Sequence, residues 1–205
     1  MGIPDRKRRE QANLRQKILD AALRIFAEQG YDKVSMRKIA ALIDYSPTTI
    51  YRFFRNKEQL LQTITADTYK DLSARFEKIK SGGGDDPLAT LKALIKEYIV
   101  FCVEQPEMTK LFLGLASFEM EDGILYERVG GSRHRVYQSW SEFIKKSIES
   151  GRLEITDETK VFLFLWDAAN GYMNQRISYP GVPRKPLAQD LDEFLGLLFR
   201  GIGSR

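Results

Sequence analysis

The sequence predicts an all-α fold of about nine helices, and three observations lead to that prediction. Apolar residues recur at spacings of three and four in one stretch after another along the 205 residues. No stretch shows the period-two alternation that is typical of a half-buried strand. Segments rich in glycine, proline and polar residues separate the helical stretches, as in "EQPE", "SGRLEITD" and "YPGVPRKP". We therefore expect a small N-terminal helical bundle followed by a larger C-terminal one.

The first helix is expected in "LRQKILDAALRIFAEQG", which Gly30 ends from the position after the C-cap. Its apolar residues form one stripe that faces a core: Leu14, Ile18, Ala21, Ala22, Ile25 and Phe26. Four basic residues precede this helix, Arg6, Lys7, Arg8 and Arg9. Two interpretations of them stay open: a disordered, solubilising end, or an arm laid along DNA.

The next three helices are marked by residues that favour helix starts. Ser35 is a suitable N-cap for a short helix in "VSMRKIAALI". Ser46 can cap a third helix with Pro47 at its first position, where a missing N–H has no consequence. Asn56 can cap a fourth helix, which is expected to run to about Lys80.

The clearest break in the chain is "SGGGDDP", a flexible connector or loop. Five further helices are expected after it, at about residues 87–105, 107–118, 124–150, 157–179 and 187–203. We divide the chain into an N-terminal domain, residues 1–55, and a C-terminal domain, residues 56–205.

Composition narrows the class of protein. Residues 1–60 hold 13 Lys and Arg against 7 Asp and Glu, whereas the rest of the chain holds 19 against 21. A basic first third on a near-neutral body favours a part that meets a polyanion. One cysteine and one histidine leave no disulfide and no Cys/His metal cluster, and no apolar run has the length of a membrane span. We expect a soluble cytoplasmic protein without a metal or cofactor.

Residues 35–54 have the length of a helix-turn-helix and its order of short helix, tight turn and second helix. In that motif the second helix enters the major groove of DNA. The side chains expected near base edges come at the start of that helix, because its N-terminal residues reach deepest: Tyr45, Pro47, Thr48 and Thr49. Phosphate contacts are expected from Arg37, Tyr51 and Lys57, with the helix start at Asn56 adding backbone N–H groups. Phe53 is either a further contact or a packing residue.

The stretch "IFAEQGYDKVSMRKIAALIDYSPTTIYRFFRNKEQL" resembles the DNA-binding domain of the TetR family of bacterial transcriptional repressors. The shared motifs are Phe-x-x-x-Gly-Tyr, Ser-Met-Arg-x-Ile-Ala, Ser-Pro-x-Thr-x-Tyr and Phe-x-x-Lys-Glu-x-Leu, within about residues 14–61. The resemblance implies a homodimer of all-helical subunits, each with a DNA-binding head and a ligand-binding, dimer-forming body. By position, its DNA contacts fall on Arg37, Pro47, Thr48, Thr49, Tyr51, Phe53 and Lys57.

This sequence departs from the family pattern in the turn, where Asp44-Tyr45 replaces the usual Gly-Val. Asp tolerates left-handed backbone less well than Gly, so local strain is expected at this position. The carboxylate also adds negative charge beside the DNA. The departure affects which operator sequence is bound, not the motif.

The body is expected to bind a small molecule, for which the aromatic residues suit an apolar or aromatic effector. The candidate ligand-binding residues are Tyr98, Phe101, Phe112, Phe118, Trp140, Phe143, Trp166 and Asn170. Ordinary core packing is the alternative for each aromatic residue. The candidate dimer interface lies on the last two helices, whose apolar residues exceed what one core needs: Trp166, Ala169, Met173, Leu191, Phe194, Leu195, Leu198 and Ile202.

The function expected is therefore a dimeric repressor that binds a palindromic operator and is released by a small-molecule effector. One alternative is an architectural DNA-binding protein without an effector. A helical enzyme is the other, but the sequence holds no P-loop, Gly-x-Ser-x-Gly or His-Glu-x-x-His motif.

Overall fold

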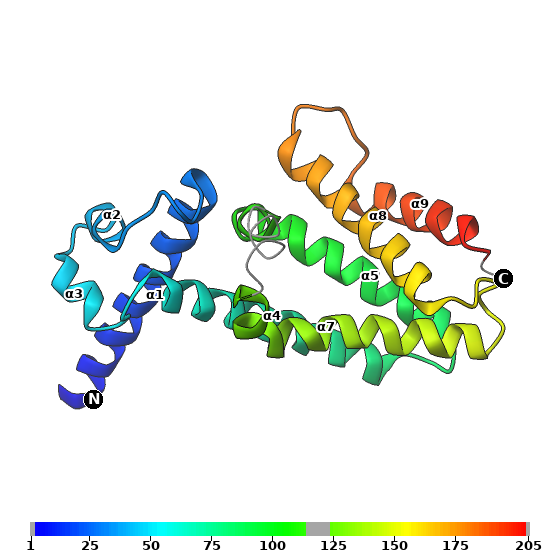
Figure 1. The fold of residues 1–205 in the computed structure, drawn as a ribbon, viewed down its shortest axis with the longest axis horizontal. Helices are drawn as coiled ribbons and strands as arrows, with labels where there is room; N and C mark the ends of the chain where they lie inside the picture. The colour runs from blue at the N-terminus through cyan, green and yellow to red at the C-terminus, as the bar shows by residue number, and fades with distance from the viewer. Residues whose placement is uncertain (1–2, 114–123, 204–205) are drawn as a thin grey trace. The chain divides into compact units, whose positions relative to one another are not determined.

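The computed structural model describes residues 3–113 and 124–203, with side chains for 5–113 and 134–203. Within these residues every regular element is a helix of the α type (Figure 1), so the expected all-α architecture is confirmed. Eight helices have both ends in the described residues, and residues 106–113 are helical as well. None of the described helices is both long and apolar enough to cross a membrane.

The chain divides into two compact units, which we name the head unit and the body unit. The head unit comprises Met1–Thr68 and Glu107–Gly130, and the body unit comprises Tyr69–Pro106 and Gly131–Arg205. The fourth helix therefore contributes residues to both units, and the chain returns to the head after the fifth. The domain boundary proposed at residues 55/56 stays a prediction about independently folding parts.

The head unit begins with α1 (Ile3–Gln29), α2 (Met36–Leu42), α3 (Pro47–Tyr51) and the first half of α4 (Lys57–Gly82). The capping residues act as the sequence predicts, since each accepts a hydrogen bond from the backbone N–H three residues on: Ser35 from Lys38 at 3.3 Å, Ser46 from Thr49 at 3.2 Å and Asn56 from Gln59 at 2.8 Å. Gly30 ends α1 with a φ of 81°, a value suited to glycine.

One helix starts earlier than the apolar pattern indicates. The stripe of α1 begins at Leu14, yet the helix extends back to Ile3. The basic residues at positions 6–9 are therefore helical rather than a disordered end. The apolar stripe does not extend to this part of α1, because residues 5 to 13 are exposed and face no core.

A single apolar core holds the head together. Ile18, Ile39 and Ile50 are fully buried, and Phe54 is 1% exposed. Ile50 and Phe54 lie four residues apart and attach α3 to the two helices before it. Leu111, from the helical residues 106–113, is buried in the same core.

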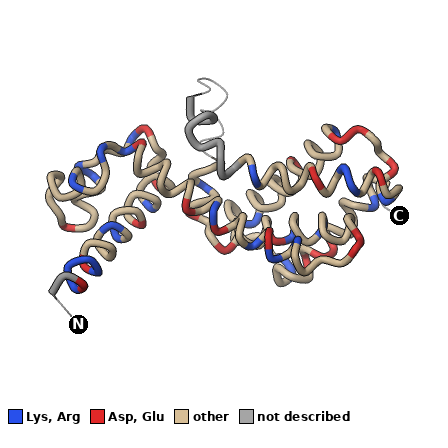
Figure 2. The backbone as a smooth tube through the Cα atoms, turned by 90° about the horizontal axis from the view of Figure 1, so that it is seen from below, with Lys and Arg blue, Asp and Glu red and all other residues tan. Residues whose placement is uncertain are grey.

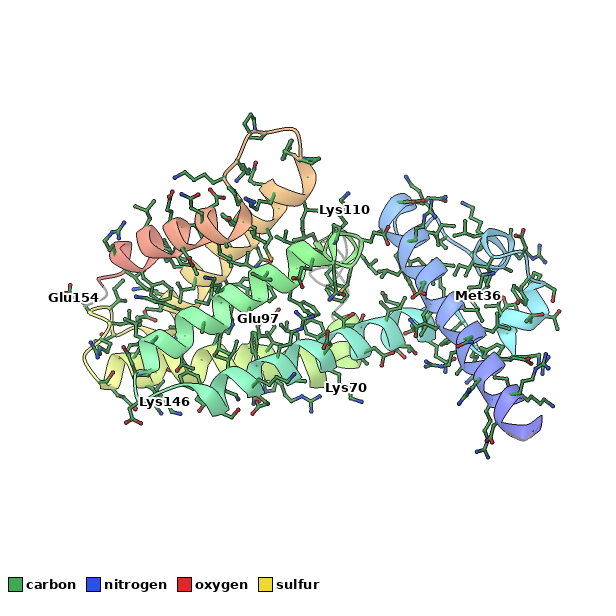
Figure 3. The ribbon with its side chains drawn as sticks, turned by 180° about the vertical axis from the view of Figure 1, so that it is seen from behind. Met36, Lys70, Glu97, Lys110, Lys146 and Glu154 are labelled. Atoms are coloured by element: carbon green, nitrogen blue, oxygen red, sulfur yellow. The ribbon has the colours of Figure 1, made fainter. Side chains whose placement is uncertain are left out.

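The body unit contains the second half of α4 with α5 (Pro87–Glu104), α7 (Ile124–Glu149), α8 (Glu158–Ser178) and α9 (Leu187–Gly201). Helix α5 packs against both α8 and α9 (Figure 1). On its other side, Glu97 of α5 accepts a hydrogen bond from Arg75 of α4 at 3.1 Å (Figure 3). The long apolar run of α5 is explained by this position, because neighbours cover it on several sides.

Candidate nucleic-acid interface

The turn between α2 and α3 has the strained backbone that the sequence predicts. Asp44 has a φ of 61°, the one positive φ of a non-glycine residue in the described part of the chain. This conformation brings the backbone N–H of Tyr45 to the carbonyl of Ala40 at 3.0 Å, which closes the turn. The turn therefore directs α3 away from α2 although the usual glycine is missing.

Helix α3 presents an open polar edge at its start. Thr48 is exposed, and no described residue is bonded to its hydroxyl. Thr49 is half-buried, and its hydroxyl is hydrogen-bonded to that of Ser46 at 2.9 Å. Thr48 is thus the threonine whose hydroxyl and methyl are both open to a base edge, while Thr49 also serves the N-cap.

Two tyrosines flank this edge, and both are partly open to solvent. Tyr45 is 40% exposed and Tyr51 is 54% exposed, although large aromatic rings are usually more buried. The amine of Lys17 lies 5.4 Å from the ring centroid of Tyr45 and also donates to the Ile43 carbonyl at 3.5 Å. Exposed tyrosines beside a cation suit phosphate or base contacts.

Lys57 has neighbours that the sequence does not reveal. Its amine donates to the backbone carbonyls of Tyr31 at 3.0 Å and of Asp32 at 3.4 Å. It also lies 4.2 Å from the centroid of the Tyr31 ring. Burial, with the negative charge of Glu58, raises the pKa of the Tyr31 hydroxyl above its ordinary value. A lysine has three donors, so one stays open for a phosphate after the two carbonyls are satisfied.

The remaining predicted contact, Arg37, is exposed on α2 and has no hydrogen bond or ion pair with any described residue. Phe53 is half-buried and packs against the head core, which favours its interpretation as a packing residue.

Sequence reasoning left out Arg52 and Arg55, whose exposed side chains also have no described partner. Their signal was present in "YRFFRNK", where both arginines flank the buried Phe54.

In the body unit, four of the expected ligand-binding residues come together. Tyr98 stacks on Trp166 with 5.3 Å between ring centroids and meets Trp140 edge-on at 5.4 Å. The Tyr98 hydroxyl donates to the Asn170 side chain at 3.4 Å. Tyr137 and Phe162 complete this group, which we name the aromatic cluster. The indole N–H of the fully buried Trp140 has no hydrogen-bond partner among the residues that the structure describes.

The other four expected ligand-binding residues lie elsewhere. Phe101 is buried under the guanidinium of Arg75, 4.8 Å from its ring centroid, and Phe143 is half-buried beside Lys146. Phe112 packs against the head core rather than in the aromatic cluster. Phe118 lies outside the described residues.

Two grooves on the body unit are lined partly by charged residues and contain none of the expected ligand-binding residues. One, between α4 and α7, has a volume of about 600 Å³ and is lined by Lys70, Ser73, Glu77, Arg135 and Glu142 among others. The other lies between α5 and α9 and includes Lys96 and Asp192, which form an ion pair. No group of His, Cys, Asp and Glu in the described residues is placed to hold a metal ion.

The apolar residues expected at a dimer interface are mostly buried within the subunit itself. Ala169, Met173, Leu191, Leu195, Leu198 and Ile202 are each at most 8% exposed. Trp166 and Phe194 are half-buried, and the Phe194 ring lies 4.5 Å from that of Tyr172. The same two helices instead expose Leu163 at 51%, Phe164 at 47% and Leu197 at 66%.

Part of this chain is similar in sequence to known proteins. Residues 18–64 match the family described as bacterial regulatory proteins, tetR family. The HTH-type transcriptional repressor KstR of Rhodococcus jostii is 30% identical over 114 residues, which are 54% of this chain and 50% of that protein. The HTH-type transcriptional regulator UidR of Escherichia coli is 36% identical over 74 residues, 36% of this chain and 38% of that protein. The chain thus spans half or less of the length of these curated relatives.

A solved structure extends the likeness of fold to most of the chain. The ketosteroid transcriptional regulator KstR2 of Mycobacterium tuberculosis has a TM-score of 0.75 at 19% identity, covering 93% of this chain and 95% of that chain. At this identity the likeness shows a shared fold.

Proposed function

We propose that this chain, whose residues 18–64 belong to the TetR family of bacterial regulatory proteins, is a transcriptional repressor that binds a palindromic operator as a dimer and leaves it when a small molecule binds. The observation that carries the proposal is the helix-turn-helix, with an exposed Thr48 at the start of α3 and exposed arginines around it. Proteins of this family are regulators rather than enzymes. The curated relative KstR is likewise a repressor by name.

The DNA-binding part of the proposal rests on exposed charge beside a base-reading edge. Arg37, Arg52 and Arg55 have no described partner, so binding a phosphate requires no internal ion pair to be broken. The head core fixes the position of α3 through Ile50 and Phe54. A rigid base-reading edge with cations on both sides suits direct readout in the major groove.

The body unit supports an apolar or aromatic effector. The aromatic cluster offers ring faces and edges, and the N–H of Trp140, which donates to no described residue, offers one hydrogen-bond donor. The fold also resembles that of the ketosteroid regulator KstR2, so a ketosteroid belongs in the first set of probes. Repacking of the cluster around a ligand is the change that we propose the body transmits to the head.

Two segments provide covalent routes for that transmission. Helix α4 begins at the head with Lys57 and continues into the body unit. The chain then returns to the head at residue 107, where Leu111 is buried in the head core. A shift of either segment would displace α3 from one half-site, because the palindrome fixes the spacing of the two heads. Coupling of about 1–3 kcal/mol would lower operator affinity roughly 5- to 150-fold.

The proposal is tested in two steps. Selection from random duplexes should enrich a palindromic sequence, which is then labelled for fluorescence anisotropy. A thermal-shift screen of apolar and aromatic compounds, ketosteroids included, should identify ligands that also release this operator. If no sequence is enriched, the repressor proposal is wrong. If ligands stabilise the protein but leave operator affinity unchanged, the chain is an architectural DNA-binding protein instead.

A further inference from the structure

The first turns of α1 form a basic helical extension that the head core does not use. The residues from 5 to 13 are exposed, while the buried stripe of α1 starts only at Ile18, with Leu14 half-buried. Figure 2 shows Lys and Arg gathered near the start of this helix. Packing thus explains neither the length of the helix nor the charge on it.

The middle of α1 is tied to the helix-turn-helix, which fixes the direction of this extension. The guanidinium of Arg15 lies 5.2 Å from the ring centroid of Phe54, three residues after the end of α3. The amine of Lys17 donates to Ile43 in the turn and lies over the Tyr45 ring. Because α1 is one continuous helix, its first turns are carried past α3 on the same rigid element.

Helical periodicity separates the four basic residues of the extension into two pairs. Arg8 precedes Arg15 by seven residues, about two turns, so it lies on the face of α1 that meets Phe54. Lys7 is in the same register with Leu14 and the buried Ile18, on the neighbouring inward face.

The other two basic residues point differently. Arg9 is in register with the exposed Gln16 and Asp20, on the outward face. Arg6 is paired with Glu10 at 2.9 Å. Neither Lys7 nor Arg8 has a hydrogen bond or ion pair with a described residue, so the two inward cations are the ones left uncompensated.

We propose that Lys7 and Arg8 form a second DNA contact, a phosphate clamp carried on the helical extension of α1 and separate from the helix-turn-helix. Two turns of helix place Arg8 about 10 Å beyond Arg15, more than the width of roughly 6 Å of the minor groove. With α3 in the major groove, the pair reaches the next sugar–phosphate strand. The contact is electrostatic and independent of sequence. This inference rests on the proposed DNA-binding function.

The test compares substitutions on the two faces in the full-length protein. Fluorescence anisotropy with a 40-base-pair duplex of arbitrary sequence is measured over a range of salt concentrations for the wild type, Arg8→Ala, Lys7→Ala/Arg8→Ala and Arg9→Ala. Arg9→Ala is the matched control, since it removes the same charge from the outward face of the same helix. We expect the slope of log affinity against log salt to fall by about 0.9 for each phosphate that is no longer neutralised, with little change for Arg9→Ala.

A fourth variant separates the position of the charges from their presence. Ala12→Pro keeps all four cations but removes a helical hydrogen bond and clashes with the Arg8 carbonyl, which breaks the extension from the rest of α1. We expect it to weaken binding as Lys7→Ala/Arg8→Ala does, at an unchanged melting temperature, because residue 12 is exposed outside the core.

The outcomes distinguish the two proposals. Equal losses for Arg8→Ala and Arg9→Ala, or full binding by Ala12→Pro, would overturn the clamp and leave a diffuse basic end. A wild-type protein that does not bind any duplex would overturn the proposed function itself, and the clamp with it.

Discussion

At the scale of single residues, Lys57 has two roles, and the first supports the second. Its amine holds the carbonyls of Tyr31 and Asp32, and it is the proposed phosphate contact at the start of α4. The bonds that fix the loop after α1 therefore also fix the position of the charge. A preplaced cation loses little side-chain freedom when it meets a phosphate.

We expect Lys57→Ala to weaken binding to every DNA sequence and to lower the salt slope by about 0.9 per subunit. Removal of its hydrogen bonds should also lower the free energy of unfolding by about 1 kcal/mol. Anisotropy and chemical denaturation measure the two effects separately. Lys78→Ala, which removes an exposed lysine of α4 in the body unit, is the control. An unchanged salt slope would mean that Lys57 has only its structural role.

Asp44 combines two unfavourable features, a φ of 61° and a negative charge next to the proposed DNA edge. Asp44→Gly should remove both, and Asp44→Asn should remove mainly the charge. We expect both variants to bind DNA more tightly. Only Asp44→Gly should also raise the free energy of unfolding, by about 0.5–1 kcal/mol after the entropy of glycine is subtracted. Chemical denaturation measures this change. If Asp44→Asn binds no better than the wild type, the carboxylate is not near the DNA.

At the scale of elements, α8 and α9 are joined by a partly buried polar network. The Tyr172 hydroxyl donates to Asp190 at 2.7 Å and accepts from Arg176 at 3.2 Å. Arg176 also donates to the Lys185 carbonyl at 2.7 Å, which attaches the loop between the two helices. Burial, followed by the bond to Asp190, raises the pKa of Tyr172 well above its ordinary value.

Tyr172→Phe should lower the free energy of unfolding by about 2 kcal/mol, because it removes a hydrogen bond to a charged group in a partly buried site. The raised pKa means that folding favours the neutral hydroxyl. Stability is therefore fully present below about pH 10 and falls as the pH rises above it, since the unfolded tyrosine ionises first. The free energy of unfolding, measured from denaturation curves at pH 8 and above pH 10, should decrease less for Tyr172→Phe than for the wild type. Tyr179→Phe, at a ring that is 55% exposed, should behave as the wild type.

At the scale of the whole molecule, the proposed dimer depends on the side of α8 and α9 that the subunit leaves open. On these two helices Leu163, Phe164 and Leu197 are exposed, whereas six of the eight apolar residues first expected at the interface fill the subunit's own core. Exposed apolar residues on two long helices suit an interface with a second copy, formed from four helices. We infer that the interface uses these exposed residues together with the half-buried Trp166 and Phe194.

Leu197→Glu should give a folded monomer in light scattering, or weaken the dimer roughly 30-fold, which corresponds to the loss of about 2 kcal/mol of apolar burial. Leu195→Glu differs, because Leu195 is 6% exposed and a charge there should unfold the body unit. Gln189→Glu, an exposed polar position on α9, is the control. A Leu197→Glu protein that remains a tight dimer would place the interface elsewhere.

The sequence by itself determined the local features of this protein. The N-caps at Ser35, Ser46 and Asn56, the end of α1 at Gly30 and the strain at Asp44 follow from bonds between residues at most a few positions apart. Such interactions can be recognised in a short window of sequence, because the residue types that satisfy a helix end are few. The helix-turn-helix, and with it the match of residues 18–64 to the tetR family, was predictable for the same reason.

Only the tertiary structure decided which apolar and charged side chains meet over long distances in the chain. It placed Leu111 and Phe112 on the head core and directed the amine of Lys57 to carbonyls 25 and 26 residues away. It also turned one face of α8 and α9 inward and left Leu163 and Leu197 exposed. An apolar stripe indicates that a face is buried but not which partner covers it, since the hydrophobic effect does not depend on the direction or identity of the contacting groups. That choice belongs to the packing of the complete chain.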